Sequence, residues 1–84
     1  MKTFYVYAIV SERDDLIYVG IATDPVARLK EHNAGRSKYT SGHVPWRLFY
    51  SELAGGSTEA RIKEKYYKTA SGKRKLRLIL ESEK

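Results

Sequence analysis

The residues of this 84-residue sequence that could carry out chemistry are two phenols, a guanidinium, an imidazole and a carboxylate. They are Tyr7, Tyr18, Arg28, His32 and Glu64. Cleavage of a phosphodiester bond needs a base for the nucleophile, positive charge for the transition state and assistance for the leaving oxygen. A single Mg²⁺ ion can be held by one or two carboxylates because it keeps most of its water ligands. These side chains would therefore suffice for phosphodiester cleavage if the fold brought them together.

Two of these residues are positioned by a short predicted helix. Asp24 is a favourable N-cap, and Pro25 suits the first helical position, where a missing N–H costs nothing. Gly35 suits the left-handed conformation that ends many helices. The helix is therefore expected between these residues. Arg28 and His32 are four residues apart, so they project from the same face of it.

Three strands are expected to hold the phenols and to pack against this helix. Residues 3–10 are mostly aromatic or β-branched, and both faces of that strand are apolar, which predicts a central strand covered on both sides. The polar turn that follows is short, so a strand at residues 16–20 returns antiparallel. A third strand is expected at residues 46–52, followed by a turn at residues 53–56. The first helix is expected to pack through Val26 and Leu29.

The carboxylate of the set lies on the first of two further predicted helices. Ser57 is expected to cap a helix that runs to about residue 69. Glu64 shares a face of it with apolar neighbours, so its carboxylate needs a partner. Ser71 is expected to cap a last helix through about residue 81. The inward-facing residues of that helix are Leu76, Ile79 and Leu80. The expected fold is a single α+β domain of order β-β-α-β-α-α, a small three-stranded antiparallel sheet flanked by helices.

The net charge of +6 is concentrated in the last third of the sequence. Residues 59–84 contain nine Lys or Arg against four Glu, a surplus of five positive charges. This favours nucleic acid through phosphate contacts, although a solvated helix face is the alternative. Cations in the first turn of the last helix oppose the helix dipole, and a phosphate nearby would explain their placement. These cations are Lys73, Arg74 and Lys75.

Composition narrows the class of protein further. The sequence has no cysteine, which excludes disulfides and thiolate metal sites. No run reaches the roughly 18 apolar residues that a membrane-spanning helix needs. The apolar N-terminal segment lacks a small-residue cleavage pattern, so we interpret it as a strand rather than a signal peptide. A cytoplasmic protein is expected. The loop at residues 36–45 is long enough to be functional, although a simple mobile connection is the alternative. Within it, Tyr39, beside Lys38, could stack on a base, so both residues are candidates for nucleic-acid binding.

The spacing of the candidate residues resembles that of the GIY-YIG nuclease superfamily. The first signature strand corresponds to Tyr5-Val6-Tyr7-Ala8-Ile9, and the second to Tyr18-Val19-Gly20. Arg28 follows the second motif by eight residues, and His32 and then Glu64 follow it. Either tripeptide alone would be a weak signal, and the combined spacing is more specific.

Within the superfamily, the sequence is most similar to small stand-alone bacterial members. These share stretches like residues 18–24 and 28–33 and a loop like residues 38–40. The similarity covers about residues 3–80. It implies an α/β sandwich that hydrolyses DNA phosphodiester bonds with one divalent ion, Mg²⁺ or Mn²⁺.

The resemblance also implies a role for each matching residue. Glu64 would hold the divalent ion, and Arg28 would face the scissile phosphate and stabilise its developing charge. Tyr18, or Tyr7 in some mechanisms proposed for the family, would activate or orient the nucleophile. His32 would assist as a proton relay or by hydrogen bonding.

The sequence departs from the family pattern at three points. Tyr5 stands where the first motif has a glycine. Asn33 is the only asparagine, so the late asparagine of some members has no counterpart. No DNA-targeting domain is expected beside the nuclease module. The glycine of the second motif is present as Gly20, which would allow close backbone approach at the strand end.

Other interpretations stay open at the level of sequence. The protein could bind nucleic acid without cleaving it, or serve as an interaction module of a DNA repair or recombination assembly. Arg28 and Glu64 could form a structural ion pair. The tyrosines could be ordinary strand residues, and His32 could lie on the surface of its helix. Glu59 is the other carboxylate available to a metal, although its first-turn position suits capping better.

Overall fold

The sheet at the centre of the protein has three antiparallel strands in a computed structural model that describes residues 2–83. Strand β1 (Phe4–Ser11) lies between β2 (Ile17–Ala22) and β3 (Trp46–Gly55). Most of β1 is buried, because its two faces and both its edges are covered. The prediction of a central first strand is confirmed.

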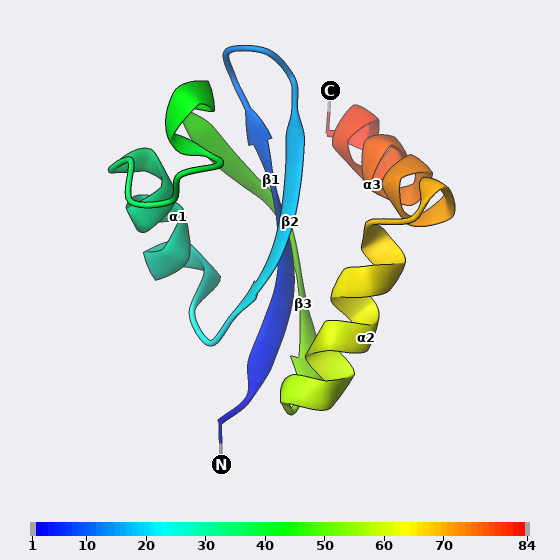
Figure 1. Cartoon of the computed structure of the whole chain (residues 1–84). Helices are drawn as coiled ribbons and strands as arrows, with labels where there is room; N and C mark the ends of the chain where they lie inside the picture. The colour runs from blue at the N-terminus through cyan, green and yellow to red at the C-terminus, as the bar shows by residue number, and fades with distance from the viewer. Residues whose placement is uncertain (1, 84) are drawn as a thin grey trace.

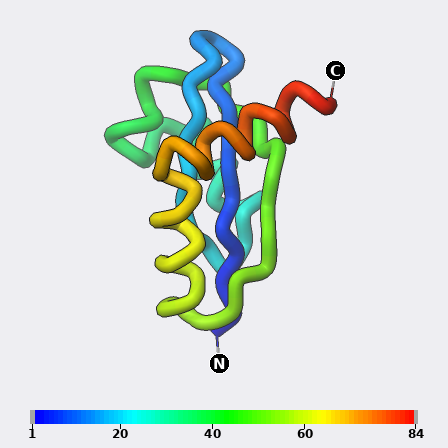
Figure 2. Tube along the Cα trace, turned by 90° about the vertical axis from the view of Figure 1, so that its right-hand side faces the viewer, coloured from blue at the N-terminus to red at the C-terminus, as the bar shows by residue number. Residues whose placement is uncertain are grey.

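The helices form layers on both faces of the sheet. Helix α1 (Pro25–Asn33) covers one face, and α2 (Ser57–Tyr67) and α3 (Ala70–Ser82) cover the other (Figure 1). Helix α2 runs along the strands, whereas α3 crosses them (Figure 2). A 3-10 helix, η1 (Ser41–His43), interrupts the loop between α1 and β3. The predicted order β-β-α-β-α-α and the α+β sandwich are confirmed. Within residues 2–83, no helix has the length and apolar character to cross a membrane.

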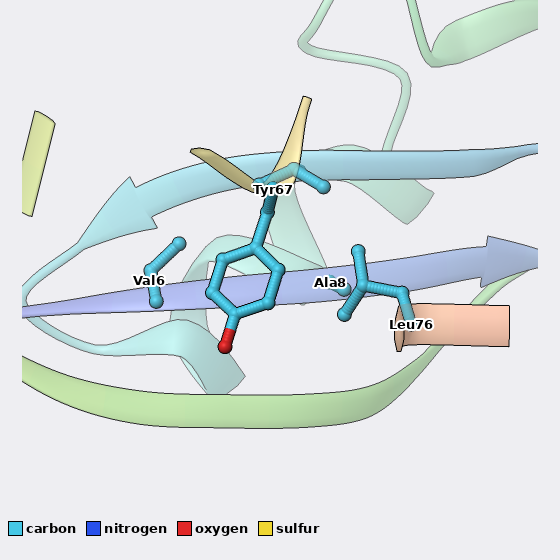
Figure 3. Close-up of a cluster of buried hydrophobic side chains, with 5 residues drawn as sticks. Val6, Ala8, Tyr67 and Leu76 are labelled. Atoms are coloured by element: carbon cyan, nitrogen blue, oxygen red, sulfur yellow. The ribbon is translucent and has the colours of Figure 1, made fainter. Parts of the chain in front are cut away.

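Alternate residues of β1 enter two separate hydrophobic cores. The core under α2 and α3 contains Val6, Ala8, Val19, Tyr67 and Leu76 (Figure 3). The core under α1 contains Tyr7, Ile9 and Trp46, with Leu29 packed against it. Val26 was expected there too, but its side chain is 56% exposed. The sheet-facing stripe of α1 runs through Leu29 and His32, and Val26 lies on the other side of Leu29 from His32.

Strand β3 is longer than the sequence pattern predicts, and the turn expected at residues 53–56 is wrong. The strand continues through Gly55 because the first residues of β1 pair with it. Tyr5 faces Leu53 and Phe4 faces Gly55, with a register shift between the two pairs. Without this extension the backbone groups at the start of β1 would lack partners on that side.

Both predicted serine caps are wrong. Helix α2 already includes Ser57, and Gly56 before it has no side chain to act as a cap. Helix α3 already includes Ser71, and its cap is Thr69, whose hydroxyl oxygen accepts a hydrogen bond from the backbone N–H of Gly72 at 3.1 Å. Only two residues separate the two helices, so α3 begins earlier than the serine position suggests.

That short connection depends on close backbone packing at Gly72. A Cβ at this position would lie 2.2 Å from the carbonyl oxygen of Tyr66 and 2.5 Å from the Cα of Tyr67. Gly72 is buried, and real Cβ atoms do not approach backbone atoms so closely. The absence of a side chain at residue 72 therefore allows α3 to turn back over the sheet directly after α2.

A carboxylate between β3 and α2 fastens the helix to the sheet. Glu52 Oε1 accepts hydrogen bonds from the hydroxyls of Tyr50 at 2.6 Å and Tyr67 at 2.8 Å. Its Oε2 lies 2.7 Å from the Nζ of Lys63. These partners, Lys63 first among them, lower the pKa of Glu52 to about 2. The carboxylate is therefore stabilised in its charged form.

Replacing this carboxylate should make stability depend on pH in a defined window. The pKa of Glu52 is depressed from 4.5 when unfolded to about 2 when folded, so its contribution is complete above the unfolded value and is lost as pH falls through that range. We expect Glu52→Gln to lower the free energy of unfolding near neutral pH by about 1–3 kcal/mol. Urea unfolding of both proteins from about pH 7 to pH 3 measures this, and the gap should narrow below about pH 4.5. A gap that is constant across this range would contradict the assignment.

Candidate active site

A chain of hydrogen bonds runs through the core beneath α1. The Tyr7 hydroxyl donates to Nε2 of His32 at 2.8 Å. Nδ1 of His32 donates to the Thr40 hydroxyl oxygen at 2.8 Å, and that hydroxyl donates to the Ser37 carbonyl at 3.4 Å. The histidine tautomer is assigned from this network: the Thr40 hydrogen is already used, so its oxygen accepts from Nδ1–H and Nε2 is free to accept.

His32 is a buried base rather than a surface residue, and the surface interpretation of this residue is wrong. Its side chain is 0% exposed. Burial, with the nearby positive charge of Arg28, lowers the pKa of His32, and the charge of Glu31 opposes this only in part. The imidazole is therefore neutral near neutral pH, with a lone pair directed at the Tyr7 hydroxyl.

The charges of two other candidate residues act on the same hydroxyl. Burial raises the pKa of Tyr7 to about 12, and Tyr18 adds to this rise. The charge and hydrogen bond of Arg28 act in the opposite direction, while the charge of Glu64 raises the pKa further. Arg28 belongs to α1 and Glu64 to α2, on opposite faces of the sheet (Figure 1). Two residues far apart in sequence thus influence the pKa of one phenol.

Gly20 provides the space for this hydroxyl. It faces Tyr7 across the β1–β2 ladder. A Cβ at residue 20 would lie 2.7 Å from the Tyr7 hydroxyl oxygen, which is too close for any side chain. The expected close approach at Gly20 is made by the Tyr7 phenol, but the strand was expected to end there and instead continues to Ala22. Because residue 20 has no side chain, the Tyr7 hydroxyl can lie against the backbone of the edge strand β2.

Tyr18 joins the site through its ring. Its centroid lies 5.1 Å from that of His32 in an edge-on arrangement and 5.6 Å from that of Tyr39. Tyr18 is half-buried, whereas Tyr39 is 57% exposed. Tyr18 therefore connects the buried relay with aromatic surface outside it.

Arg28 has a partner on its own helix, and Glu64 has one at the residue that ends α2. The Arg28 guanidinium forms an ion pair with Glu31, and the Glu64 carboxylate lies 3.2 Å from Nζ of Lys68. The alternative of an Arg28–Glu64 ion pair is wrong. Pairs between partly exposed side chains contribute at most about 1 kcal/mol, so a phosphate or a metal ion could displace either partner.

The donor set suits a metal ion that needs few protein ligands. Within residues 2–83, no three His, Cys, Asp or Glu side chains are grouped so that they could hold a metal ion. A metal ion at Glu64 would therefore have fewer than three such side chains as ligands. That fits Mg²⁺ or Mn²⁺ bound largely through water and substrate phosphate, and does not fit a structural zinc site. Glu59 lies back against Gly56 at the start of α2, consistent with its expected place at the helix end.

A groove of about 570 Å³ opens beside Tyr18 along the outer strand β2. Residues 16–19 of the β2 segment form one wall. The other lining residues are Tyr39, Lys68, Lys73 and Arg77. We call this the β2 groove.

The β2 groove takes in only part of the predicted nucleic-acid surface. Tyr39 and Lys73 line it. Lys38 and Arg74 are exposed and are not among its lining residues. Lys75 lies over the ring of Tyr67, with its Nζ 5.8 Å from the centroid.

Four residues of the site and groove were not foreseen from the sequence. Lys68 and Glu31 could have been found, because they lie four and three residues from Glu64 and Arg28 on the same predicted helices. Thr40 and Arg77 had no such local signal. Thr40 reaches His32 from a loop, and Arg77 lines the groove from α3 only because α3 folds back across the sheet.

Comparisons with known proteins agree with this geometry. A family model described as the GIY-YIG catalytic domain matches residues 3–77. UPF0213 proteins of Staphylococcus haemolyticus and of Staphylococcus aureus strains Mu3 and N315 are 40% identical to this chain over 82 residues. These matches cover 96% of this chain and 99% of each relative. No solved structure matches the chain at a significant level. The chain therefore belongs to the GIY-YIG family, a family of nucleases.

Proposed function

We propose that this protein is a divalent-metal-dependent endonuclease that hydrolyses DNA phosphodiester bonds. The observation that carries the proposal is a buried Tyr7 hydroxyl whose pKa is lowered by the charge of Arg28 and raised by that of Glu64. That hydroxyl is bonded in turn to the neutral, buried imidazole of His32. Family membership supports the same reaction class.

In the proposed reaction, Tyr7 and His32 act together as the base. A water molecule gives its proton to the Tyr7 hydroxyl oxygen while the phenolic proton passes to Nε2 of His32. The water oxygen forms a bond to phosphorus, and the bond to the leaving oxygen breaks. That oxygen departs with the electron pair of the bond and takes a proton from solvent water. Arg28 stabilises the negative charge that develops on the non-bridging oxygens. Glu64 would hold the divalent ion, which supplies further positive charge at the phosphate.

A second candidate is a protein that binds nucleic acid without cleaving it, as part of a DNA repair or recombination assembly. It is favoured by the two helix ion pairs, because they leave neither Arg28 nor Glu64 uncompensated. The cations of the β2 groove suit either function.

The test is cleavage of supercoiled plasmid and of forked DNA by the purified protein with Mg²⁺ or Mn²⁺. We expect cleavage that a chelator abolishes. Arg28→Ala should lower the rate about 10²–10³-fold, because it removes charge stabilisation of the transition state. The matched control Lys30→Ala, which removes an exposed cation of the same helix, should cleave at the wild-type rate.

The outcomes separate the two candidates. Equal cleavage by wild type and Arg28→Ala would indicate a contaminating nuclease or a wrong site. Binding to all DNA forms with no cleavage under either metal would instead favour the second candidate.

A further inference from the structure

The charged side chains that line the β2 groove are all positive. Lys68, Lys73 and Arg77 line it, and no carboxylate does. Arg77 is held in place by a hydrogen bond from its Nη2 to the Asp15 carbonyl at 2.9 Å. Within residues 2–83, no carboxylate oxygen lies within 4.0 Å of Lys73 or Arg77. Their charges are therefore available to an anionic ligand.

The groove also has an aromatic wall. The rings of Tyr18 and Tyr39 lie 5.6 Å apart at 35°. More than half of the Tyr39 side chain is exposed, so its ring can be covered by a ligand. A basic groove with exposed aromatic rings is the combination that binds single strands, in which phosphates meet cations and bases stack on rings.

The position of the groove relates it to the proposed reaction. Tyr18 lines the groove and its ring also contacts His32, the partner of Tyr7. Lys68 lines the groove and is also the partner of Glu64. A strand lying in the groove would therefore continue directly to the residues proposed for cleavage.

We propose that the β2 groove binds an unpaired DNA strand, with one base stacked on Tyr39 and the adjoining phosphates held by Lys68, Lys73 and Arg77. This inference rests on the proposed function and specifies its substrate as DNA with a single-stranded segment beside the cut. Stacking on Tyr39 needs an open base face, and the bases inside a duplex have both faces covered by their neighbours. The groove volume of about 570 Å³ also lies in the range of pockets for small ligands, which matches a nucleotide rather than a whole duplex.

The test measures binding with a chelator present, so that no cleavage is needed. Fluorescence anisotropy compares a blunt duplex, the same duplex with an oligo-dT overhang, and that duplex with an overhang of equal length made of abasic sites. We expect the wild type to prefer the dT overhang to the other two by about fivefold or more. Tyr39→Ala should lose about tenfold in affinity for the dT overhang, and Tyr39→Phe should keep it.

A matched pair of variants tests the phosphate contacts. Lys73→Gln should weaken binding of the dT overhang about threefold or more, whereas Arg74→Gln, which removes the neighbouring charge outside the groove, should have a smaller effect. Melting curves verify that each variant is folded.

Several results would overturn the inference. These are equal binding of blunt and overhang DNA by the wild type, unchanged binding by Tyr39→Ala, and equal losses in Lys73→Gln and Arg74→Gln. Displacement of the overhang DNA by micromolar thymidine monophosphate would assign the groove to a free nucleotide instead. Preference for the dT overhang without cleavage of any DNA would uphold this inference while rejecting the proposed endonuclease, so the two failures are distinguishable.

Discussion

Glu64→Gln is expected to lower DNA cleavage by a factor of about 10³ or more, with the fold retained. Glutamine has nearly the same size as glutamate but no negative charge, so it cannot hold Mg²⁺ or Mn²⁺ in a site that has so few protein ligands. The pair with Lys68, whose own side chain is half exposed, contributes little to stability, so the variant should melt close to the wild type. Single-turnover cleavage with excess protein measures the effect on the chemical step.

The matched control for this substitution is Glu59→Gln on the same helix. Glu59 lies in the first turn of α2, and its charge is not among those that shift the pKa of Tyr7, whereas that of Glu64 is. It should cleave at the wild-type rate. Wild-type activity in Glu64→Gln together with loss in Glu59→Gln would move the metal to Glu59. Loss in neither variant would reject a carboxylate-held metal on α2.

Gly72→Ala is expected to destabilise the protein by about 3 kcal/mol or more. The added Cβ would meet backbone atoms of Tyr66 and Tyr67, which cannot move aside as a flexible side chain can. Relief requires α2 and α3 to separate, and that would pull Tyr67 and Leu76 out of the core that they share. For a chain of this size, such a loss corresponds to a fall in Tm of about 12–24 °C, measurable by circular dichroism.

Gly42→Ala is the matched control for this stability prediction. Residue 42 lies in η1, and a Cβ there would meet no atom within 4 Å. We expect its Tm to stay within a few degrees of the wild type, roughly 1 kcal/mol at most. Similar Tm values for the two variants would show that the connection between α2 and α3 can relax around a side chain.

Secondary structure was predictable from the sequence where the conformation of a segment depends on its own residues. The apolar faces of residues 3–10 indicated a central strand, and Asp24 with Pro25 fixed the start of the first helix. The end of β3 was not predictable, since pairing with Phe4 and Tyr5 decides it. The start of α3 was not predictable either, because it depends on backbone packing at Gly72 against the preceding helix.

The candidate site also has features that were predictable from local sequence and features that were not. The motif spacing predicted Tyr7, Tyr18, Arg28 and Glu64 as site residues, and the effect of the other three on the pKa of Tyr7 required the folded chain. The bond between His32 and Thr40 had no signal in the sequence, because a loop threonine can accept from many donors. The β2 groove required α3 to cross the sheet, which brings Arg77 near the wall formed by β2. Local sequence patterns thus predicted the candidate residues, whereas tertiary contacts decided which of those residues lie together.

The direction of the hydrogen bonds from Tyr7 to Ser37 makes the strength of the Tyr7–His32 base depend on whether substrate is bound. Each hydrogen in the chain is already donated toward Ser37, so a proton that leaves Tyr7 comes to rest on His32. There it would form an imidazolium that is opposed both by burial and by the charge of Arg28. A phosphate bound at Arg28 neutralises the second of these effects and strengthens the base. In the proposed enzyme, bound substrate thereby strengthens the base that activates the attacking water, and the base is weaker while the site is empty.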